Sequence, residues 1–100
     1  MYDIKVSNNA KRMLEQHISF INNVDHLSAI NTKDILLNAI KSLEEIPMRC
    51  PYFNEGFIVK NKYRKLIVNK RYIIIFQIRD MTVYVDYIID TRQDYQFLLR

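Results

Sequence analysis

The chain has 100 residues, 49% of them hydrophobic, and its 15 Lys and Arg against 11 Asp and Glu give a formal net charge of +4. This length suits one domain with one core, and the apolar share excludes a disordered chain. A single cysteine excludes an internal disulfide, and a single glycine excludes the glycine-rich loops that hold nucleotide phosphates. The longest apolar run, residues 72–76, is too short to span a membrane, and the first residues show no signal segment. We therefore expect one basic cytoplasmic domain over residues 1–100, with no membrane association, no cofactor and no metal.

The first half of the chain predicts a strand and two amphipathic helices. Residues 2–6 alternate between apolar and polar side chains, as in a short strand. Ser7 or Asn8 is placed to cap the first helix, Ser28 to cap the second, and Pro47 ends the second. Apolar residues at three- and four-residue steps predict one buried stripe on each helix. The first stripe comprises Ala10, Met13, Leu14, His17, Ile18, Ile21 and Val24, and the second comprises Ile30, Lys33, Leu36, Leu37, Ile40, Leu43 and Ile46.

The second half is rich in β-branched and aromatic residues, which predicts strands over residues 57–59, 65–68, 72–78 and 82–89. The short links between the last three predict antiparallel hairpins. The run 72–76 has no polar face, which is typical of a central strand that is covered on at least one side. Residues 92–99 are predicted to form a short C-terminal helix that docks on the sheet through Phe97, Leu98 and Leu99. The expected fold class is α+β, with a two-helix hairpin packed on a mostly antiparallel sheet of four to five strands.

The net charge is unevenly distributed along the chain. Basic and acidic residues balance in the first half, so the surplus lies in residues 51–100. A concentrated basic stretch is an electrostatic footprint for an anionic partner, either nucleic acid or an acidic protein. The alternative is a solvated hairpin whose lysines protect a sheet edge. The stretch contains no acidic residue and comprises Lys60, Lys62, Arg64, Lys65, Lys70 and Arg71.

A few single residues carry weaker signals. His17 lies on the apolar stripe, as a boundary residue does, and neither His17 nor His26 has an acidic neighbour at metal-binding spacing. Cys50 has no base beside it in the sequence, so we predict no reactive thiol. Tyr84 and Tyr87 fall on opposite faces of one predicted strand. At least one of these tyrosines is therefore expected at the surface, where it stacks on a base or contacts a protein.

Several segments together carry a family resemblance. They are the end of the second predicted helix at residues 39–47, the strand segments 63–68, 72–76 and 83–85, and the closing residues 90–95. In this order and spacing they resemble the RelE/ParE toxins of bacterial type II toxin–antitoxin systems, also called plasmid-stabilisation proteins. The resemblance covers nearly the whole chain. It implies a RelE/ParE-like fold, a bacterial cytoplasmic toxin that arrests growth when free, and a cognate antitoxin that neutralises it.

The resemblance leaves two targets open. RelE-like members cleave messenger RNA in the ribosomal A site, whereas ParE-like members inhibit DNA gyrase, so the target must be argued from the site. RelE-like members carry an arginine directly after the tyrosine that opens the apolar strand. Here Tyr72 is followed by Ile73, and Leu66 stands where a second lysine is expected, although Arg64 falls at the place of the first. These departures favour the ParE-like branch.

The nuclease alternative names its own catalytic residues. Metal-free RNA cleavage needs a base, an acid and cations around the reacting phosphate. If Arg64 and Arg92 do not act on RNA, we expect Arg64 to form a salt bridge to Asp86 or Asp90 across the sheet and Arg92 to pair with Asp94 or the C-terminus. If the chain cleaves RNA, the catalytic residues are predicted to be Arg64, Arg71, Arg92 and Tyr95, with Arg71 in place of the missing arginine.

Binding residues are predicted independently of the target. The surface for an antitoxin or for the target, gyrase or ribosome-bound message, is expected to comprise Lys60, Lys62, Arg64, Lys65, Tyr84 and Tyr87. A third hypothesis is a non-toxic basic domain that binds nucleic acid or protein.

Overall fold

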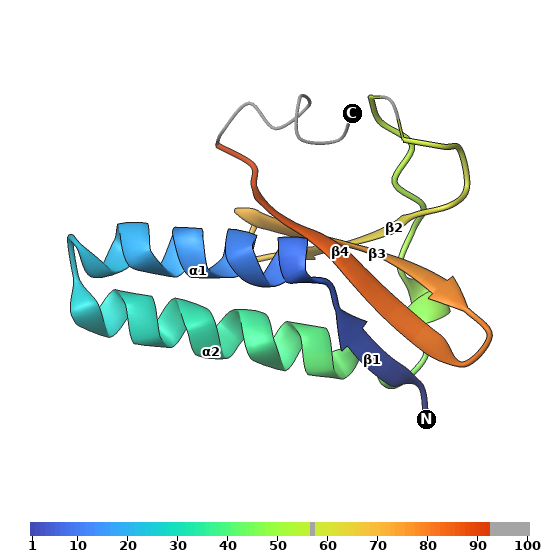
Figure 1. Ribbon diagram of the computed structural model, residues 1–100, viewed down its shortest axis with the longest axis horizontal. Coiled ribbons are helices and arrows are strands. Elements are labelled where there is room, and N and C mark those ends of the chain that lie inside the picture. Colours follow the sequence, from blue (N-terminus) through green and yellow to red (C-terminus); the bar gives the residue numbers. More distant parts are fainter. Residues whose placement is uncertain (57, 93–100) are drawn as a thin grey trace.

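The computed structural model describes residues 1–56 and 58–92. Its elements are strand β1 (Asp3–Val6), helices α1 (Asn8–Asn22) and α2 (His26–Ser42), the short 3₁₀ helix η1 (Pro47–Arg49), and strands β2 (Arg64–Val68), β3 (Tyr72–Arg79) and β4 (Thr82–Asp90). Figure 1 shows α1 and α2 as an antiparallel hairpin against one side of the sheet. The predicted α+β class is confirmed. Within the described ranges, no helix is long and apolar enough to cross a bilayer.

The strands described by the structure form one sheet of four, in the order β1-β4-β3-β2. β1 runs parallel to β4, and the other neighbours are antiparallel. β3 lies in the interior of the sheet, and residues 72–76 are all buried, as their apolar run predicted. The strand predicted at residues 57–59 is absent at residues 58 and 59, where the backbone turns instead. Residue 57 and the segment 93–99 of the predicted C-terminal helix lie outside the described residues, and Arg92 lies in a turn.

The helix starts are set by two different caps. The Ser7 hydroxyl accepts a hydrogen bond from the Ala10 backbone N–H at 3.0 Å, as predicted. For α2 the predicted cap was wrong, because Asp25 rather than Ser28 precedes the helix. The Asp25 carboxylate accepts from the Leu27 backbone N–H at 3.1 Å and from the Ser28 hydroxyl at 2.7 Å. A carboxylate with two free oxygens takes both donors, which leaves Ser28 in the first turn.

The buried faces of the helices differ from the predicted stripes. In α2, Ala29 joins Leu36 and Ile40 on the buried face, whereas Ile30 and Leu37 are 47% and 44% exposed. Residues one position apart on a helix lie on neighbouring faces, and only the packing decides which of the two is covered. Val24 and Ile46, the last members of the two predicted stripes, lie beyond the helix ends and are exposed.

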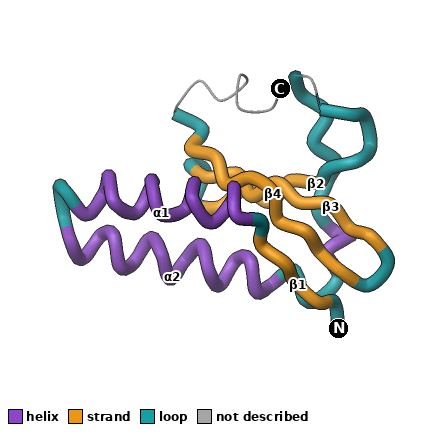
Figure 2. The backbone as a smooth tube through the Cα atoms, in the orientation of Figure 1, coloured by secondary structure: helices purple, strands orange, loops and turns teal. Residues whose placement is uncertain are grey.

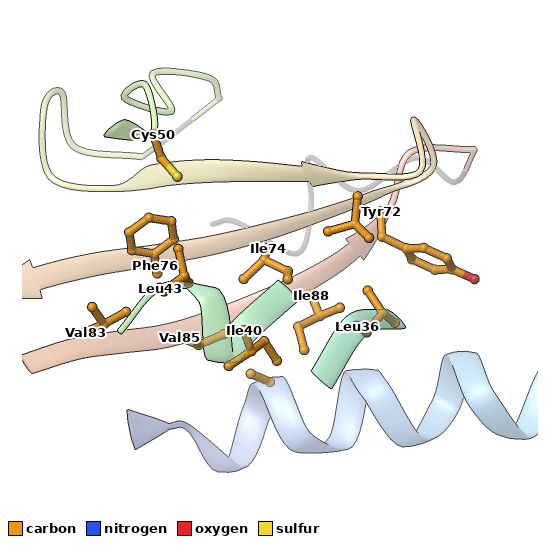
Figure 3. Close-up of a cluster of buried hydrophobic side chains, with 12 residues drawn as sticks. Leu36, Ile40, Leu43, Cys50, Tyr72, Ile74, Phe76, Val83, Val85 and Ile88 are labelled. Carbon is orange, nitrogen blue, oxygen red and sulfur yellow. The ribbon is translucent and has the colours of Figure 1, made fainter. Parts of the chain in front are cut away.

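The core fills both sides of the sheet. Figure 3 shows the larger cluster, in which Leu36, Ile40 and Leu43 face Ile74 and other residues of β3 and β4. Cys50 belongs to the same cluster, and burial raises the pKa of its thiol. On the opposite side, the connection between η1 and β2 supplies Phe53, which packs with Ile73, Ile75 and Ile89, and Met13 of α1 joins this cluster at the edge. Figure 2 shows this connection on the side of the sheet away from the helices. Cover on both sides explains why the run 72–76 has no polar face.

A β-bulge interrupts the pairing of β3 with β4. Ile75 pairs with Tyr87 while Phe76 pairs with Val85, so Asp86 has no partner in the ladder. Its carbonyl is left free to accept hydrogen bonds from the Ser7 hydroxyl at 3.3 Å and the Asn9 side-chain amide at 3.2 Å. The bulge therefore fastens the start of α1 to β4.

The same bulge corrects the predicted placement of the two tyrosines of β4. Val83, Val85 and Ile88 all pack in the helix-side cluster, although Val85 and Ile88 are three residues apart. The extra residue shifts the alternation of side chains by one position. Tyr84 and Tyr87 consequently share the face away from the helices, and the prediction that they lie on opposite faces was wrong.

Candidate functional site

Two arginines meet one carboxylate where β3 begins and β4 ends. Tyr72 pairs with Asp90 across the two strands, and Arg71 and Arg92 flank this pair in the chain. Arg71 Nε lies 3.5 Å from Asp90 Oδ2, and Arg92 Nη2 lies 3.3 Å from the same oxygen. The backbone N–H and Nε of Arg92 also donate to Asp90 Oδ1, at 2.9 and 3.3 Å.

Asp90 holds these cations as a buried anion. Its residue is 4% exposed, and burial by itself raises the pKa of the carboxyl. The hydrogen bonds from the backbone and side chain of Arg92, together with the charges of Arg92 and Arg71, outweigh burial and leave the pKa below its ordinary value of 3.8. Asp90 is therefore ionised at neutral pH and partly neutralises both guanidinium groups.

The cluster lines a cavity of about 360 Å³ that is closed on one side by α1. His17 Nε2 donates to the Ile88 carbonyl at 2.8 Å, and the His17 ring lies 5.5 Å from the Tyr72 ring, measured between centroids. His17 thus links α1 to β3 and β4. In the described ranges, no three His, Cys, Asp or Glu side chains gather as metal ligands. The described residues that line the cavity are Gln16, His17, Phe20, Arg71, Tyr72, Asp90 and Arg92.

Arg64 has a different set of partners. Its Nη1 donates to the backbone carbonyls of Cys50 at 2.7 Å and Met48 at 3.1 Å, and its guanidinium lies 4.2 Å from the Tyr52 ring centroid. The predicted salt bridge to Asp86 or Asp90 was wrong, because β3 lies between β2 and β4.

The structure therefore assembles only part of the predicted nuclease set. Arg71 and Arg92 come together at Asp90, and this replaces the predicted partners of Arg92, which lie outside the described residues. Arg64 is far from this cluster. It pairs with Phe76, whereas Tyr72 pairs with Val68, and four positions along a strand span about 13 Å. Tyr95 lies outside the described residues.

The predicted binding residues form two groups. Lys60 and Lys62 are exposed in the connection before β2, and Lys65 is half-buried on β2 beside Arg64. Tyr84 and Tyr87 belong to the sheet face away from the helices, and the Tyr87 ring packs against the Tyr63 ring at 6.1 Å. The two groups adjoin each other, because Lys62 Nζ lies 5.3 Å from the Tyr63 ring centroid and Lys65 pairs with Ile75, whose partner on β4 is Tyr87.

Sequence reasoning missed two cations beside Tyr84. The Arg79 guanidinium lies 4.3 Å from the Tyr84 ring centroid, and Lys5 Nζ lies 6.0 Å from it. Arg79 ends β3 and Lys5 belongs to β1, so sheet order brings them together from opposite ends of the chain. Only the alternation of Lys5 with Ile4 and Val6 in the sequence hinted at this face.

The centre of the same face carries a polar network around the Asp86 carboxylate. Gln77 Nε2 donates to Asp86 Oδ2 at 2.9 Å. Burial, together with the charge of Asp86 and a hydrogen bond to it, raises the pKa of Tyr63 to about 12. Tyr63 is therefore protonated at neutral pH, and it is a hydrogen-bond donor there rather than a base.

With this geometry in view, the comparisons with known proteins identify the family. The family model for the ParE toxin of the type II toxin–antitoxin system parDE matches residues 4–95. The chain belongs to the ParE toxin family. The predicted RelE/ParE resemblance is confirmed, and this ParE-family toxin is the toxin component of a type II system, a class that is paired with a cognate antitoxin.

Several solved chains match the fold of this ParE-family toxin. One of them is the chromosomal ParDE toxin–antitoxin system from P. aeruginosa, with a TM-score of 0.75 and 12% sequence identity, and the match covers 90% of this chain and 96% of that chain. At this identity the likeness concerns the fold. Comparison with curated protein sequences gives no match.

Proposed function

We propose that this ParE-family toxin arrests growth by inhibiting DNA gyrase and that it does not cleave messenger RNA. The observation that carries the proposal is the arrangement of its arginines. Arg71 and Arg92 are held by the Asp90 carboxylate, and Arg64 is held by two backbone carbonyls. Cations that stabilise a phosphorane must converge on one phosphate, and Arg64 lies about 13 Å along the strand from the Arg71–Arg92 cluster.

Two further observations support the same target. Ile73 follows Tyr72 where RelE-like nucleases have an arginine, and its side chain is buried against Phe53 on the face away from the helices. The matching family model is that of ParE. We infer that a growth-arresting toxin without this arginine acts by binding its target.

We also propose where partners dock. Lys60, Lys62 and Lys65 form a positive surface around the start of β2, and Tyr84 and Tyr87 add an aromatic surface on the sheet. An acidic antitoxin segment or the target is attracted by the lysines and buries the tyrosines. Arg64 contributes to this surface by fastening the loop that carries Tyr52 beside it.

A supercoiling assay tests the proposed target. Purified toxin is titrated to micromolar concentration against gyrase, relaxed plasmid and ATP, while primer extension on translated messages follows RNA in cells that express the toxin. We expect loss of supercoiling or accumulation of cleaved DNA, without new 5′ ends. Unaffected gyrase would overturn the proposal, and new 5′ ends at ribosome-bound codons would assign the toxin to the nuclease branch instead.

A further inference from the structure

Two buried donors without hydrogen-bond partners belong to neighbouring residues that line the cavity at the ends of β3 and β4. Tyr72 Oη and Arg71 Nε each expose less than 1 Å² and have no hydrogen-bond partner. Over residues 1–56 and 58–92, no other buried side-chain nitrogen or oxygen shares this state. Buried polar groups in folded proteins are rarely unpaired, because desolvation is then not compensated. That both lie in neighbouring residues of one cavity points to a ligand.

The cavity has more donors than acceptors. Its one carboxylate, Asp90, already accepts three hydrogen bonds from Arg92, at 2.9, 3.3 and 3.3 Å. Arg71 Nε lies 3.5 Å from that carboxylate without forming a hydrogen bond. In Figure 3 the Tyr72 ring extends away from the other labelled side chains, with its hydroxyl at the far end. Two guanidinium groups against one carboxylate also leave an excess of positive charge.

We propose that this cavity binds the phosphate group of a small phosphate monoester, with Arg71 and Tyr72 as donors. A phosphate monoester carries negative charge and three terminal oxygens, so it can accept from both residues and from Arg92 at once. A carboxylate offers only two oxygens for the same donors. The Arg71 side chain is 31% exposed, so it can move to admit a phosphate while the core stays closed.

The rest of the cavity suits an organic group attached to the phosphate. A volume of about 360 Å³ exceeds what a phosphate needs and lies in the range of small-molecule sites. Phe20 lines the same cavity and is 66% exposed, so its ring offers an apolar wall on which a nucleobase can stack. Inorganic phosphate and a nucleoside monophosphate both offer the phosphate group to Arg71 and Tyr72, and a titration with each of them tells the two ligands apart.

This binding site is independent of the proposed gyrase inhibition. Tyr72 and Asp90 pair at the end of the sheet beside α1, whereas Tyr84 and Tyr87 point to the opposite face. Loss of phosphate binding therefore leaves the target question open, and failure to inhibit gyrase leaves this site intact.

Calorimetric titration of the full-length toxin tests the proposal with AMP, inorganic phosphate and adenosine. We expect saturable binding of AMP, weaker binding of phosphate and no binding of adenosine. Arg71→Gln and Tyr72→Phe should each weaken AMP binding at least tenfold. Tyr72→Phe removes one unpartnered oxygen only, so the variant folds, and a thermal melt verifies this.

The chain offers a matched control on the opposite face. Arg79 lies over Tyr84 at 4.3 Å, much as Arg71 lies over Tyr72 at 5.0 Å. Arg79→Gln and Tyr84→Phe should leave AMP binding unchanged. Equal losses from both pairs indicate diffuse electrostatic attraction and overturn the proposal. So do binding of adenosine as tight as that of AMP, no binding of AMP or phosphate at millimolar concentration, or Tyr72-dependent binding of a glutamate-containing peptide in place of phosphate.

Discussion

Arg64 and Cys50 are joined by a 2.7 Å hydrogen bond from the guanidinium Nη1 to the backbone carbonyl. A second bond of 3.1 Å, to the Met48 carbonyl, fastens the segment around η1 to the edge strand β2. Arg64, which the sequence marks as a functional candidate, therefore stabilises the loop before β2. Any loss of toxin activity on its replacement must be judged against the stability of this loop.

Replacement of Arg64 by Gln is expected to destabilise the fold. Two carbonyls lose a charged donor, so the free energy of unfolding should fall by about 2 kcal/mol. Urea unfolding measures this change. Lys65→Gln is the matched control on the same strand, since no hydrogen bond or ion pair holds that side chain within the described residues. Its effect should stay below about 0.5 kcal/mol. Equal stabilities for the two variants would contradict the anchoring role of Arg64.

Ser7→Ala should cost about 1 kcal/mol of stability, because Ser7 caps α1. Its hydroxyl accepts from the Ala10 N–H and also donates to the carbonyl that the bulge at Asp86 leaves free. Thermal unfolding compares this variant with Ser19→Ala, an exposed position near the other end of α1. Equal melting temperatures for Ser7→Ala and Ser19→Ala would show that the Ser7 cap does not stabilise the fold.

Because of Asp90, the free energy of unfolding of the toxin should depend on pH in the acidic range. Its folded-state pKa lies below the ordinary value of 3.8. Its contribution is therefore complete above that ordinary value and is lost as the pH falls through the lower folded-state pKa. The free energy of unfolding of the wild type should decline as the pH falls below about 5, and Asp90→Asn should flatten part of this decline.

The Asp90 comparison has a built-in control. The pKa of Asp25 is also lowered, chiefly by its hydrogen bond with Ser28, and this effect is present in both proteins. The difference between the two curves therefore isolates Asp90. At neutral pH the variant should lose about 2 kcal/mol, since both arginines are partly exposed and screened by solvent. Parallel curves would show that the cluster does not stabilise the fold.

Because of Tyr63, the free energy of unfolding should depend on pH in the alkaline range. Burial and the Asp86 carboxylate raise its pKa to about 12 from an ordinary 10.0. Its contribution is complete below the unfolded-state pKa and is lost as the pH rises through the folded-state pKa. Stability should fall between about pH 10 and pH 12, and less steeply in Tyr63→Phe. Tyrosinate absorption measures the titration, and an identical alkaline transition in both proteins would refute this assignment.

Charge reversal tests the proposed docking surface. Lys62→Glu combined with Lys65→Glu should weaken antitoxin binding at least tenfold, because it replaces attraction by repulsion at the start of β2. Lys11→Glu with Lys33→Glu makes the same change of net charge on the helical hairpin and should have little effect. Surface plasmon resonance with the cognate antitoxin measures both. Equal losses would mean that net charge, and not this surface, governs the interaction.

The sequence by itself determined the family and the main elements, although the strand predicted at residues 57–59 is absent at residues 58 and 59. Periodic apolar residues mark α1 and α2, and the run at residues 72–76 marks the buried strand, because these patterns depend only on the geometry of one helix or one strand. The segments that resemble RelE/ParE toxins lie within these same elements. Neither conclusion needs any knowledge of which distant residues meet.

Only the tertiary structure decided the site. The bulge at Asp86 reverses the side-chain alternation between Tyr84 and Tyr87, and a strand pattern cannot show it, because it arises from the pairing with β3. The register of Tyr72 with Asp90 brings Arg71 and Arg92, 21 positions apart in the chain, to one carboxylate. Sheet order likewise separates Arg64 from Asp90 by a whole strand. Such contacts join distant segments, so their partners are set by packing and register rather than by local pattern.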